Sequence, residues 1–233
     1  PTIVAKTDFE LELDANGNAT LNADDLDNGT TDETTFTLAV DKTDFDCSNL
    51  GAFDVTLTAT DDQGATSSQV VSITIKDNIK PVITLVGNSN VDISLGSVYT
   101  DDGANVDDNC SATLANTSTV DTNTLGSYTV TYSATDASGN ESDQLVRIVN
   151  VIDTTPPTVI VNPTVSVQLD ANGKATITPQ DVDTGSSDNT GGVTFSLDQT
   201  SFTCANLGEN DVVLTVTDAS GNSSTATVQV IIN

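Results

Sequence analysis

One short pattern occurs three times along this chain at a fixed spacing, and this repetition restricts the possible folds more than any other feature of the sequence. Each copy consists of Leu-Gly and, ten residues after that glycine, an Asp-x-x-Gly segment. A pattern that recurs roughly every 75–80 residues indicates tandem modules, each large enough for a small core of its own. The Asp-x-x-Gly segments start at Asp61, Asp136 and Asp218.

Alternating apolar residues lie on both sides of each Asp-x-x-Gly segment, which is the period of a strand with one buried face. Before the segment, the apolar residues are Val55, Leu57 and Ala59, then Val130, Tyr132 and Ala134, then Val212, Leu214 and Val216. After it, they are Val71, Ile73 and Ile75, then Val146, Ile148 and Asn150, then Val228, Val230 and Ile232. We therefore expect a β-hairpin in every copy, with Asn150 as the one polar residue on the buried face.

The acidic residues are of the kind found in loops rather than in helices. The chain has 29 Asp but only 5 Glu, and Asp favours turns and helix caps whereas Glu propagates helices. The commonest other residues include 39 Thr and 26 Val, which both favour strands. Hydrophobic residues make up 36%, which suffices for sheets with Thr-rich outer faces. We expect an all-β protein with almost no helix.

Proline-containing segments separate the copies. They occupy residues 77–81 and 153–157, and Pro1 corresponds to the proline of the first segment. We place boundaries near residues 78 and 154, which gives modules of residues 1–78, 79–154 and 155–233. Frequent turn signals in modules of this size predict a small antiparallel sandwich of about seven strands in each. The abrupt start at Pro1 indicates a piece of a longer protein.

Missing residue types exclude most enzyme classes. The chain has no His, so it cannot form a Ser-His-Asp or Cys-His nucleophilic unit or a His-bearing zinc site. Its aromatic residues, 6 Phe and 3 Tyr, are too few for a sugar-cleaving cleft, and we expect no catalysis. The formal net charge of −28 repels phosphate backbones and anionic lipid. Cations, rather than nucleic acids or membrane surfaces, are the expected partners, and no apolar run is long enough for membrane insertion.

Acidic loops are dense enough to hold a cation. Residues 101–108 and residues 24–32 each contain four carboxylates, which repel one another unless a hard cation takes their oxygens. The pattern of residues 25–32 returns at residues 181–188. The candidate calcium ligands in these loops are Asp25, Asp27, Asp32, Asp101, Asp102, Asp107, Asp108, Asp181, Asp183 and Asp188. The alternative interpretation is that these residues serve turn geometry and solubility, and none of the loops matches an EF-hand.

Chain direction predicts two further calcium sites at the module junctions. If the modules are joined end to end, the last strand of each runs away from its Asp-x-x-Gly turn, so that turn lies beside the incoming linker. Linker and turn aspartates that share Ca²⁺ are also how cadherins stiffen their strings of domains. The competing interpretation, a good turn and nothing more, is equally compatible with the sequence. The candidate ligands are Asp77, Asn78, Asp136 and Asn140 at the first junction, and Asp153, Asp218 and Asn222 at the second.

The two outer modules are more similar to each other than to the middle one. Leu-Asp-Ala-Asn-Gly-x-Ala-Thr occurs at residues 13–20 and 169–176, and its Asn-Gly step predicts a tight hairpin turn. Both modules also contain Asp-x-Asp-x-Gly-x-x-Asp, Phe-x-Cys-x-Asn-Leu-Gly and Thr-Asp-x-x-Gly. This ordered set resembles the hyalin-repeat (HYR-type) immunoglobulin-like domains of very large surface proteins in Bacteroidetes.

The middle module resembles a related bacterial surface immunoglobulin-like domain. The similarity rests on Gly-Ser-Val-Tyr-Thr-Asp-Asp-Gly-Ala at residues 96–104 and on Leu-Gly-Ser-Tyr-Thr-Val-Thr-Tyr-Ser-Ala-Thr-Asp-Ala-Ser-Gly-Asn at residues 125–140. Together, the two resemblances imply three tandem immunoglobulin-like antiparallel β-sandwiches in an extended rod. They also imply a non-catalytic spacer or adhesion role, because such modules form stalks in adhesins, including gliding-motility adhesins.

The cysteines depart from the pattern of this family. HYR-type repeats commonly pair the Cys of an Asp-Asn-Cys loop with the Cys of Phe-x-Cys, but the outer modules retain only Cys47 and Cys204. The middle module retains Cys110 and has Thr122 at the partner position. Each module thus holds half of a bridge, so we expect no disulfide within a module and three unpaired thiols.

The sequence therefore predicts a non-catalytic stalk or adhesion segment of an extracellular bacterial surface adhesin, stiffened by calcium. The alternative is a carbohydrate-binding or other ligand-binding accessory module of a secreted multidomain protein, which exposed aromatic platforms would support. The expected partners are neighbouring repeats of the same parent chain and cell-surface polysaccharide or protein, and the expected state is a monomer.

Small-angle X-ray scattering tests the rod. Three modules joined end to end, with strands of about 8 residues plus loops, are expected to span on the order of 100 Å or slightly more. A maximum dimension near 60 Å, roughly that of a compact trefoil of the same modules, would contradict the expectation.

Overall fold

The protein is all-β. A computed structural model describes all residues from Pro1 to Asn233 and contains eighteen strands. The one α-helix, α1 (Pro179–Val182), is four residues long, and the remaining helical segments are the 3₁₀ turns η1 (Ala23–Leu26), η2 (Cys47–Asn49) and η3 (Cys204–Asn206). The expectation of β-sheets with almost no helix is confirmed. The structure has no helix with the length and hydrophobicity needed to cross a bilayer.

The sheets form tandem immunoglobulin-like β-sandwiches within two compact units. The first unit comprises Pro1–Val91, Thr100–Val120 and Thr129–Ile148, and the second Asp92–Tyr99, Asp121–Tyr128 and Val149–Asn233. The finer division into three modules with boundaries at residues 78 and 154 stays a prediction.

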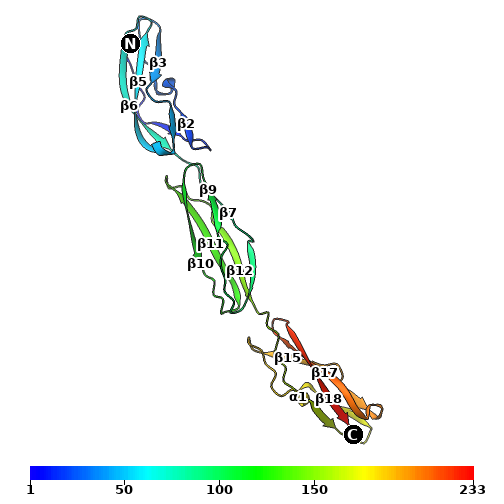
Figure 1. The fold of residues 1–233 in the computed structure, drawn as a ribbon. Helices are drawn as coiled ribbons and strands as arrows, with labels where there is room; N and C mark the ends of the chain where they lie inside the picture. The colour runs from blue at the N-terminus through cyan, green and yellow to red at the C-terminus, as the bar shows by residue number, and fades with distance from the viewer. The chain divides into compact units, whose positions relative to one another are not determined.

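The N-terminal part of the first unit packs a four-stranded sheet against a two-stranded one (Figure 1). The larger sheet has the order β1 (Phe9–Glu12), β6 (Thr66–Lys76), β5 (Gly51–Asp61), β3 (Phe36–Val40), and the smaller one pairs β2 (Asn18–Thr20) with β4 (Asp44–Asp46). β1 runs parallel to β6, and the other pairs are antiparallel. The alternating residues of β5 and β6 are buried as predicted and form the core with Leu21, Leu26 and Phe45.

The middle segment of the chain forms a second four-stranded sheet. Its order is β10 (Ala112–Ser118), β11 (Gly126–Asp136), β12 (Leu145–Ile152), β8 (Asn90–Ser94), and β7 (Val82–Leu85) pairs separately with β9 (Ala104–Asp107). In β11, Val130, Tyr132 and Ala134 are buried as predicted.

The register predicted for β12 is wrong by one residue. Arg147, Val149 and Val151 are buried, whereas Val146 and Ile148 are exposed. In the other two copies the buried series begins seven residues after the turn glycine, and here it begins eight residues after Gly139. One additional residue exchanges the two faces of a strand, because side chains alternate with period two.

The polar residue on the buried face of β12 is therefore Arg147 and not Asn150. Arg147 is 0% exposed, and its guanidinium pairs with the carboxylate of Asp101, which also accepts a hydrogen bond from the Tyr132 hydroxyl. Its Nε donates to the Asn88 carbonyl at 3.0 Å. A buried charge is tolerated only when it is paired and hydrogen-bonded in this way.

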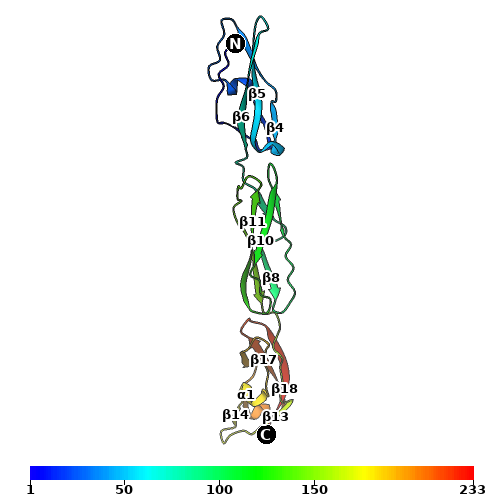
Figure 2. The ribbon, with the colours of Figure 1, turned by 90° about the vertical axis from the view of Figure 1, so that its left-hand side faces the viewer.

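The second unit repeats the arrangement of the N-terminal sheets (Figure 2). The larger sheet has the order β13 (Thr164–Val167), β18 (Ser223–Ile232), β17 (Gly208–Asp218), β15 (Val193–Leu197), and the smaller one pairs β14 (Lys174–Thr176) with β16 (Ser201–Thr203). The predicted alternating residues of β17 and β18 are buried, and they form the core with Ile177, Val182 and Phe202.

The predicted Asn-Gly turns form, but they do not close hairpins. Gly17 has a φ of +73°, and the Asp14 carboxylate accepts hydrogen bonds from the backbone N–H groups of Asn16 and Asn18. The strands on either side belong to different sheets, since β1 pairs with β6 and β2 with β4. The turn therefore carries the chain from one sheet of the sandwich to the other.

The expectation of three unpaired thiols is wrong. Cys47 and Cys110 form a disulfide across 63 residues of sequence, whereas Cys204 is free and exposed. Counting cysteines within each module missed this bond, because its two halves come from neighbouring repeats. The loop that follows β9 lies against the Gly17 turn, beside the cysteine that follows β4.

Thiol titration of the denatured protein checks this bond. Without reductant we expect one reactive thiol per chain, from Cys204, and after reduction all three cysteines. Three reactive thiols in oxidised, unreduced protein would show that the cross-link does not form.

Candidate metal centres

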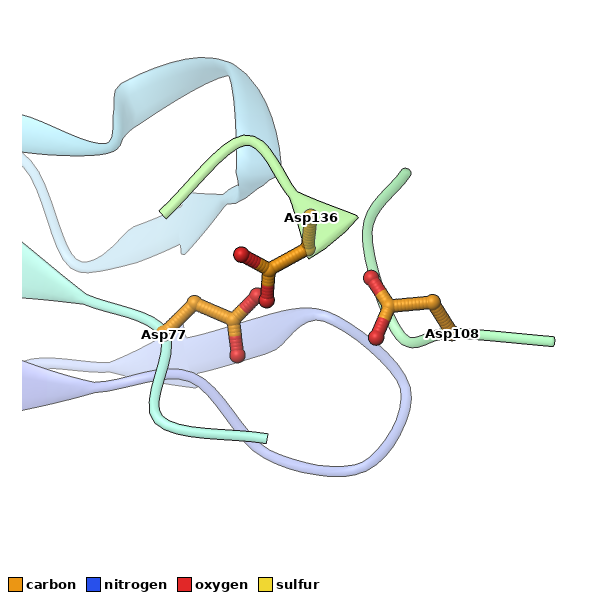
Figure 3. Close-up of side chains that lie close together, drawn as sticks. All are labelled: Asp77, Asp108 and Asp136. Carbon is orange, nitrogen blue, oxygen red and sulfur yellow. The ribbon is translucent and has the colours of Figure 1, made fainter. Parts of the chain in front are cut away.

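Two groups of three aspartates gather their carboxylates in the structure. We call Asp77, Asp108 and Asp136 the first cluster, and Asp153, Asp188 and Asp218 the second cluster. Within each cluster, one carboxylate oxygen per residue lies within 4.8 Å of the others. Figure 3 shows the carboxyl groups of the first cluster turned toward one another from three separate chain segments. Asp77 directly follows β6, Asp108 follows β9 and Asp136 ends β11.

Asp136 is held by the turn that it starts. Its Oδ1 accepts hydrogen bonds from the backbone N–H groups of Ser138, at 2.9 Å, and Asn140, at 2.8 Å. Its Oδ2 accepts one from the Asn140 side-chain amide at 2.7 Å. The same amide donates to the backbone carbonyl of Asp77 at 2.9 Å. Asn140 therefore ties the turn to the segment that leaves β6.

Two buried carboxylate oxygens of the first cluster accept no hydrogen bond. Asp77 is only 4% exposed, and its Oδ1 accepts from the Ile79 backbone and the Asn109 side chain, but its Oδ2 has no partner. Asp108 accepts from the Cys110 N–H with Oδ2, and its buried Oδ1 has no partner either. Each buried polar atom left unsatisfied costs about 1–3 kcal/mol, and more when it is charged. A bound cation would satisfy these oxygens.

The electrostatic environment of Asp108 also disfavours an ionised carboxylate without a partner. Burial raises the pKa of Asp108, and the neighbouring carboxylates of Asp136 and Asp77 raise this pKa further, against the lowering effect of the Cys110 backbone N–H. Three carboxylates that repel one another in a partly desolvated place favour either a proton or a cation.

In the second cluster the turn aspartate is held as in the first, but a threonine hydroxyl contacts the other two aspartates. The Asp218 carboxylate accepts from the backbone N–H of Asn222 at 2.8 Å and from its side-chain amide at 2.9 Å, and that amide also donates to the Asp153 carbonyl at 3.1 Å. The Thr190 hydroxyl lies 2.7 Å from a carboxylate oxygen of Asp153 and 2.7 Å from one of Asp188. A hydroxyl has one proton, so it can serve only one of the two carboxylates at a time.

Both donor sets fit a hard cation. They consist of carboxylate oxygens without His or thiolate, which is the chemistry of Ca²⁺ or Mg²⁺ rather than of zinc. Ca²⁺ accepts six to eight oxygens in flexible geometry, whereas Mg²⁺ demands a tight octahedron and retains several waters. Carboxylates that come from three separate chain segments are better suited to the ion that tolerates more varied geometry, so Ca²⁺ is the ion that fits these sites better. The three carboxylates of each cluster are the residues that would hold it.

The junction residues named from the sequence gather as their chain direction suggests, with one exception. Asp77, Asp136 and Asn140 meet in one place, and Asp153, Asp218 and Asn222 in the other. Asn78 is instead engaged with Glu12, to which its side-chain amide donates at 2.9 Å.

The loop aspartates named from the sequence mostly make local hydrogen bonds. The carboxylates of Asp25 and Asp181 accept from the backbone N–H groups of the residues directly before η1 and α1. Others accept from backbone N–H groups two or three residues ahead, which are turn bonds; these are Asp27, Asp32 and Asp183. Asp32 also accepts a hydrogen bond from the Thr34 hydroxyl at 2.9 Å. Asp101 pairs with Arg147, and neither Asp102 nor Asp107 belongs to a cluster.

Sequence reasoning did not group Asp108 and Asp188 with the junction residues. A signal was present, because Asp-Asn occurs at residues 108–109 and again at residues 188–189, at the same place in consecutive repeats. The supporting roles of Asn109 and Thr190 were also missed, since both depend on contacts between loops that are distant in the sequence.

Comparison with known proteins shows what the middle part of the chain is similar to. Residues 83–151 match the family model described as "Bacterial surface protein, Ig-like domain", so the middle part of the chain is similar to bacterial surface immunoglobulin-like domains. An uncharacterized 81.3 kDa protein of Acholeplasma phage L2 is 30% identical over an alignment of 202 residues, and the match covers 78% of this chain and 26% of that protein. The chain thus spans about a quarter of the length of this curated relative.

Similar solved structures include titin, protocadherin and cadherin domains. A three-domain titin structure has 11% identity and a TM-score of 0.43, and the match covers 98% of this chain and 96% of that one. The protocadherin GammaB4 extracellular domain has 18% identity and a TM-score of 0.37, with coverage of 100% and 49%. Drosophila N-cadherin EC1-3 has 13% identity and a TM-score of 0.37, with coverage of 98% of both. Scores this low carry no argument about function.

The substitution Asp77→Asn separates a cation site from a solvated turn. It removes one of three mutually repelling charges, so in chelator the melting temperature is expected to stay the same or to rise. In calcium, part of the calcium-dependent increase in melting temperature should be lost, because one ligand is weakened. Asp143→Asn removes an exposed charge outside both clusters and is the matched control. Equal calcium responses in the two variants would contradict a site at the first cluster.

Proposed function

We propose that this chain is a non-catalytic stalk and adhesion segment of a large extracellular bacterial surface protein, stiffened by calcium bound at both clusters. The observation that carries this proposal is the composition of the clusters. In each of them, a buried aspartate of the segment that leaves one long strand meets an aspartate of a loop and an aspartate of a hairpin turn. A cation held by all three would restrict the motion of these segments relative to one another.

The type of the middle domain supports a location at the cell surface, and the resemblance of the outer repeats to HYR-type domains supports the finer assignment. On that basis we assign the segment to a Bacteroidetes adhesin of the gliding-adhesin kind, built from the modules 1–78, 79–154 and 155–233. Its partners are the neighbouring repeats of the parent chain and cell-surface polysaccharide or protein. The segment acts as a monomer, without nucleic acid and without insertion into the membrane.

The distribution of aromatic side chains favours a stalk over a sugar-binding module. Sugar platforms need exposed aromatic rings, and every Phe and Tyr of this chain is buried or half-buried. Phe45, Tyr132 and Phe202 lie at most 2% exposed in the sandwich cores. The aromatic residues therefore stabilise the fold and leave no stacking surface for a sugar.

Thermal unfolding in calcium tests the stiffening role. An ion that binds only the folded state adds RT ln(1 + [L]/Kd) to the free energy of unfolding, which is about 2.7 kcal/mol per site at 100 times Kd. For a domain of this size the melting temperature should rise by several degrees. NaCl of matched ionic strength should not reproduce the increase, because screening is not coordination.

Two controls make the calcium result decisive. EDTA should return the protein to its starting melting temperature, and MgCl₂ at the same concentration should give a smaller increase than CaCl₂. If millimolar calcium moves neither the melting temperature nor the scattering profile beyond matched NaCl, the clusters are not calcium sites and the stiffening role is refuted.

A further inference from the structure

The second unit contains a second copy of the structure that holds Cys47 in the first unit. We call each copy, a cysteine that follows a short strand and the Asn-Gly turn beside it, a half-site. Cys47 starts η2 directly after β4, and Cys204 starts η3 directly after β16. Two residues before each cysteine, a phenylalanine is buried in the core. Each sulfur lies beside the carbonyl of the glycine in the Asn-Gly turn, at 3.7 Å from Gly17 and 3.9 Å from Gly173. The two half-sites therefore share the strand and 3₁₀ turn around the cysteine, the buried phenylalanine and the neighbouring Asn-Gly turn.

The surroundings of the glycine in each turn show that a loop covers the first half-site and that no loop covers the second. A Cβ at Gly17 would lie 2.5 Å from the Asn109 carbonyl oxygen and 2.7 Å from the Cys47 sulfur, so a side chain there would exclude the loop that carries Cys110. A Cβ at Gly173 would lie 2.8 Å from the Cys204 sulfur and would meet nothing else within 4 Å. The Gly173 turn thus has the same form as the Gly17 turn, but no loop packs against it.

Exposure distinguishes the two half-sites in the same way. In the first unit, Leu50 and Cys47 are half-buried and both pack against the hydrophobic core. In the second unit, the equivalent Leu207 is 59% exposed, and the Cys204 thiol is exposed as well. In the first unit the two counterparts pack against the core and are half-buried, whereas in the second unit the apolar side chain and the thiol are exposed together, as in the uncovered half of an interface.

We propose that Cys204 is the attachment point for a further β-sandwich module that follows the third repeat and carries an Asp-Asn-Cys loop. The three loop residues have separate roles in the bond that already exists. The cysteine supplies the sulfur; the asparagine side chain donates to the Asp14 carbonyl, at 3.3 Å; and the aspartate accepts from the cysteine N–H, at 3.2 Å. Asp170 occupies the place of Asp14 in the third repeat, and its carboxylate caps its turn in the same way.

The bond forms by two thiol–disulfide exchanges with a small disulfide oxidant such as oxidised glutathione. The Cys204 thiolate attacks one sulfur of the oxidant and displaces a glutathione thiolate. The cysteine of the incoming loop, as thiolate, then attacks the Cys204 sulfur of this mixed disulfide and displaces the second glutathione thiolate. The two protein thiols lose two protons and two electrons, and the oxidant is reduced to two thiols.

A fusion protein tests the proposal with residues of this chain alone. Residues 1–233 are followed directly by a second copy of residues 77–154, which brings its own Asp-Asn-Cys loop. The control fusion adds a second copy of residues 153–233, whose corresponding loop has Thr190 in place of the cysteine. Both are oxidised with glutathione, and their bonds are mapped by mass spectrometry without reduction.

In the first fusion we expect the Cys47–Cys110 bond, a new bond from Cys204 to the added loop, and no free thiol. In the control we expect the Cys47–Cys110 bond alone and two free thiols. The variant Cys204→Ser of the first fusion should show the same melting temperature of the added module and one free thiol, which confirms that this module folds. A Cys204 thiol that stays free or bound to glutathione in the first fusion, with the added module folded, would overturn the proposal.

Discussion

Each long hairpin of this protein has one aspartate that caps its turn, and in two of the three hairpins, at Asp136 and Asp218, this aspartate also belongs to a cluster. Asp136 shows the arrangement: one carboxylate oxygen accepts the backbone N–H groups of the turn, and the carboxyl group also lies among the other carboxylates of the first cluster. Turn geometry and cation binding are therefore not competing explanations for the Asp-x-x-Gly segments, since one carboxylate can serve both.

Much of the fold could be predicted from the sequence, because alternation identifies strands and their buried faces. Val55, Leu57 and Ala59 are buried as the pattern predicts, and so are their counterparts in the other repeats. The prediction failed at β12, where one additional residue after the turn reverses the buried face. A shift of one residue leaves the apolar pattern plausible in either register. Only the pairing of Arg147 with Asp101 reveals the correct one, and these two residues lie far apart in the sequence.

The candidate sites show the same limit. The meeting of Asp77 with Asp136 follows from the direction of the last strand, whereas the contribution of Asp108 depends on how a loop packs against the preceding repeat. The disulfide is not evident from the sequence for a related reason: its two cysteines belong to neighbouring repeats, so a count within each repeat cannot pair them. The two clusters also secure the third aspartate differently, through Cys110 in the first and through the Thr190 hydroxyl in the second. In the sequence this difference is visible only as Cys110 in one loop and Thr190 at the same place in the other.

The disulfide also changes how the polypeptide would respond to a pulling force. Cys47 and Cys110 enclose a covalent loop of 63 residue steps, which includes the long strands β5 and β6. Tension applied to the two ends of the chain passes through the sulfur–sulfur bond and bypasses this loop. At about 3.4 Å per residue, roughly 210 Å of polypeptide is withheld from extension, whatever becomes of the hydrogen bonds around it. Under load, the oxidised chain therefore has a shorter maximum length than the reduced chain, and the β5–β6 hairpin cannot be drawn out from its ends.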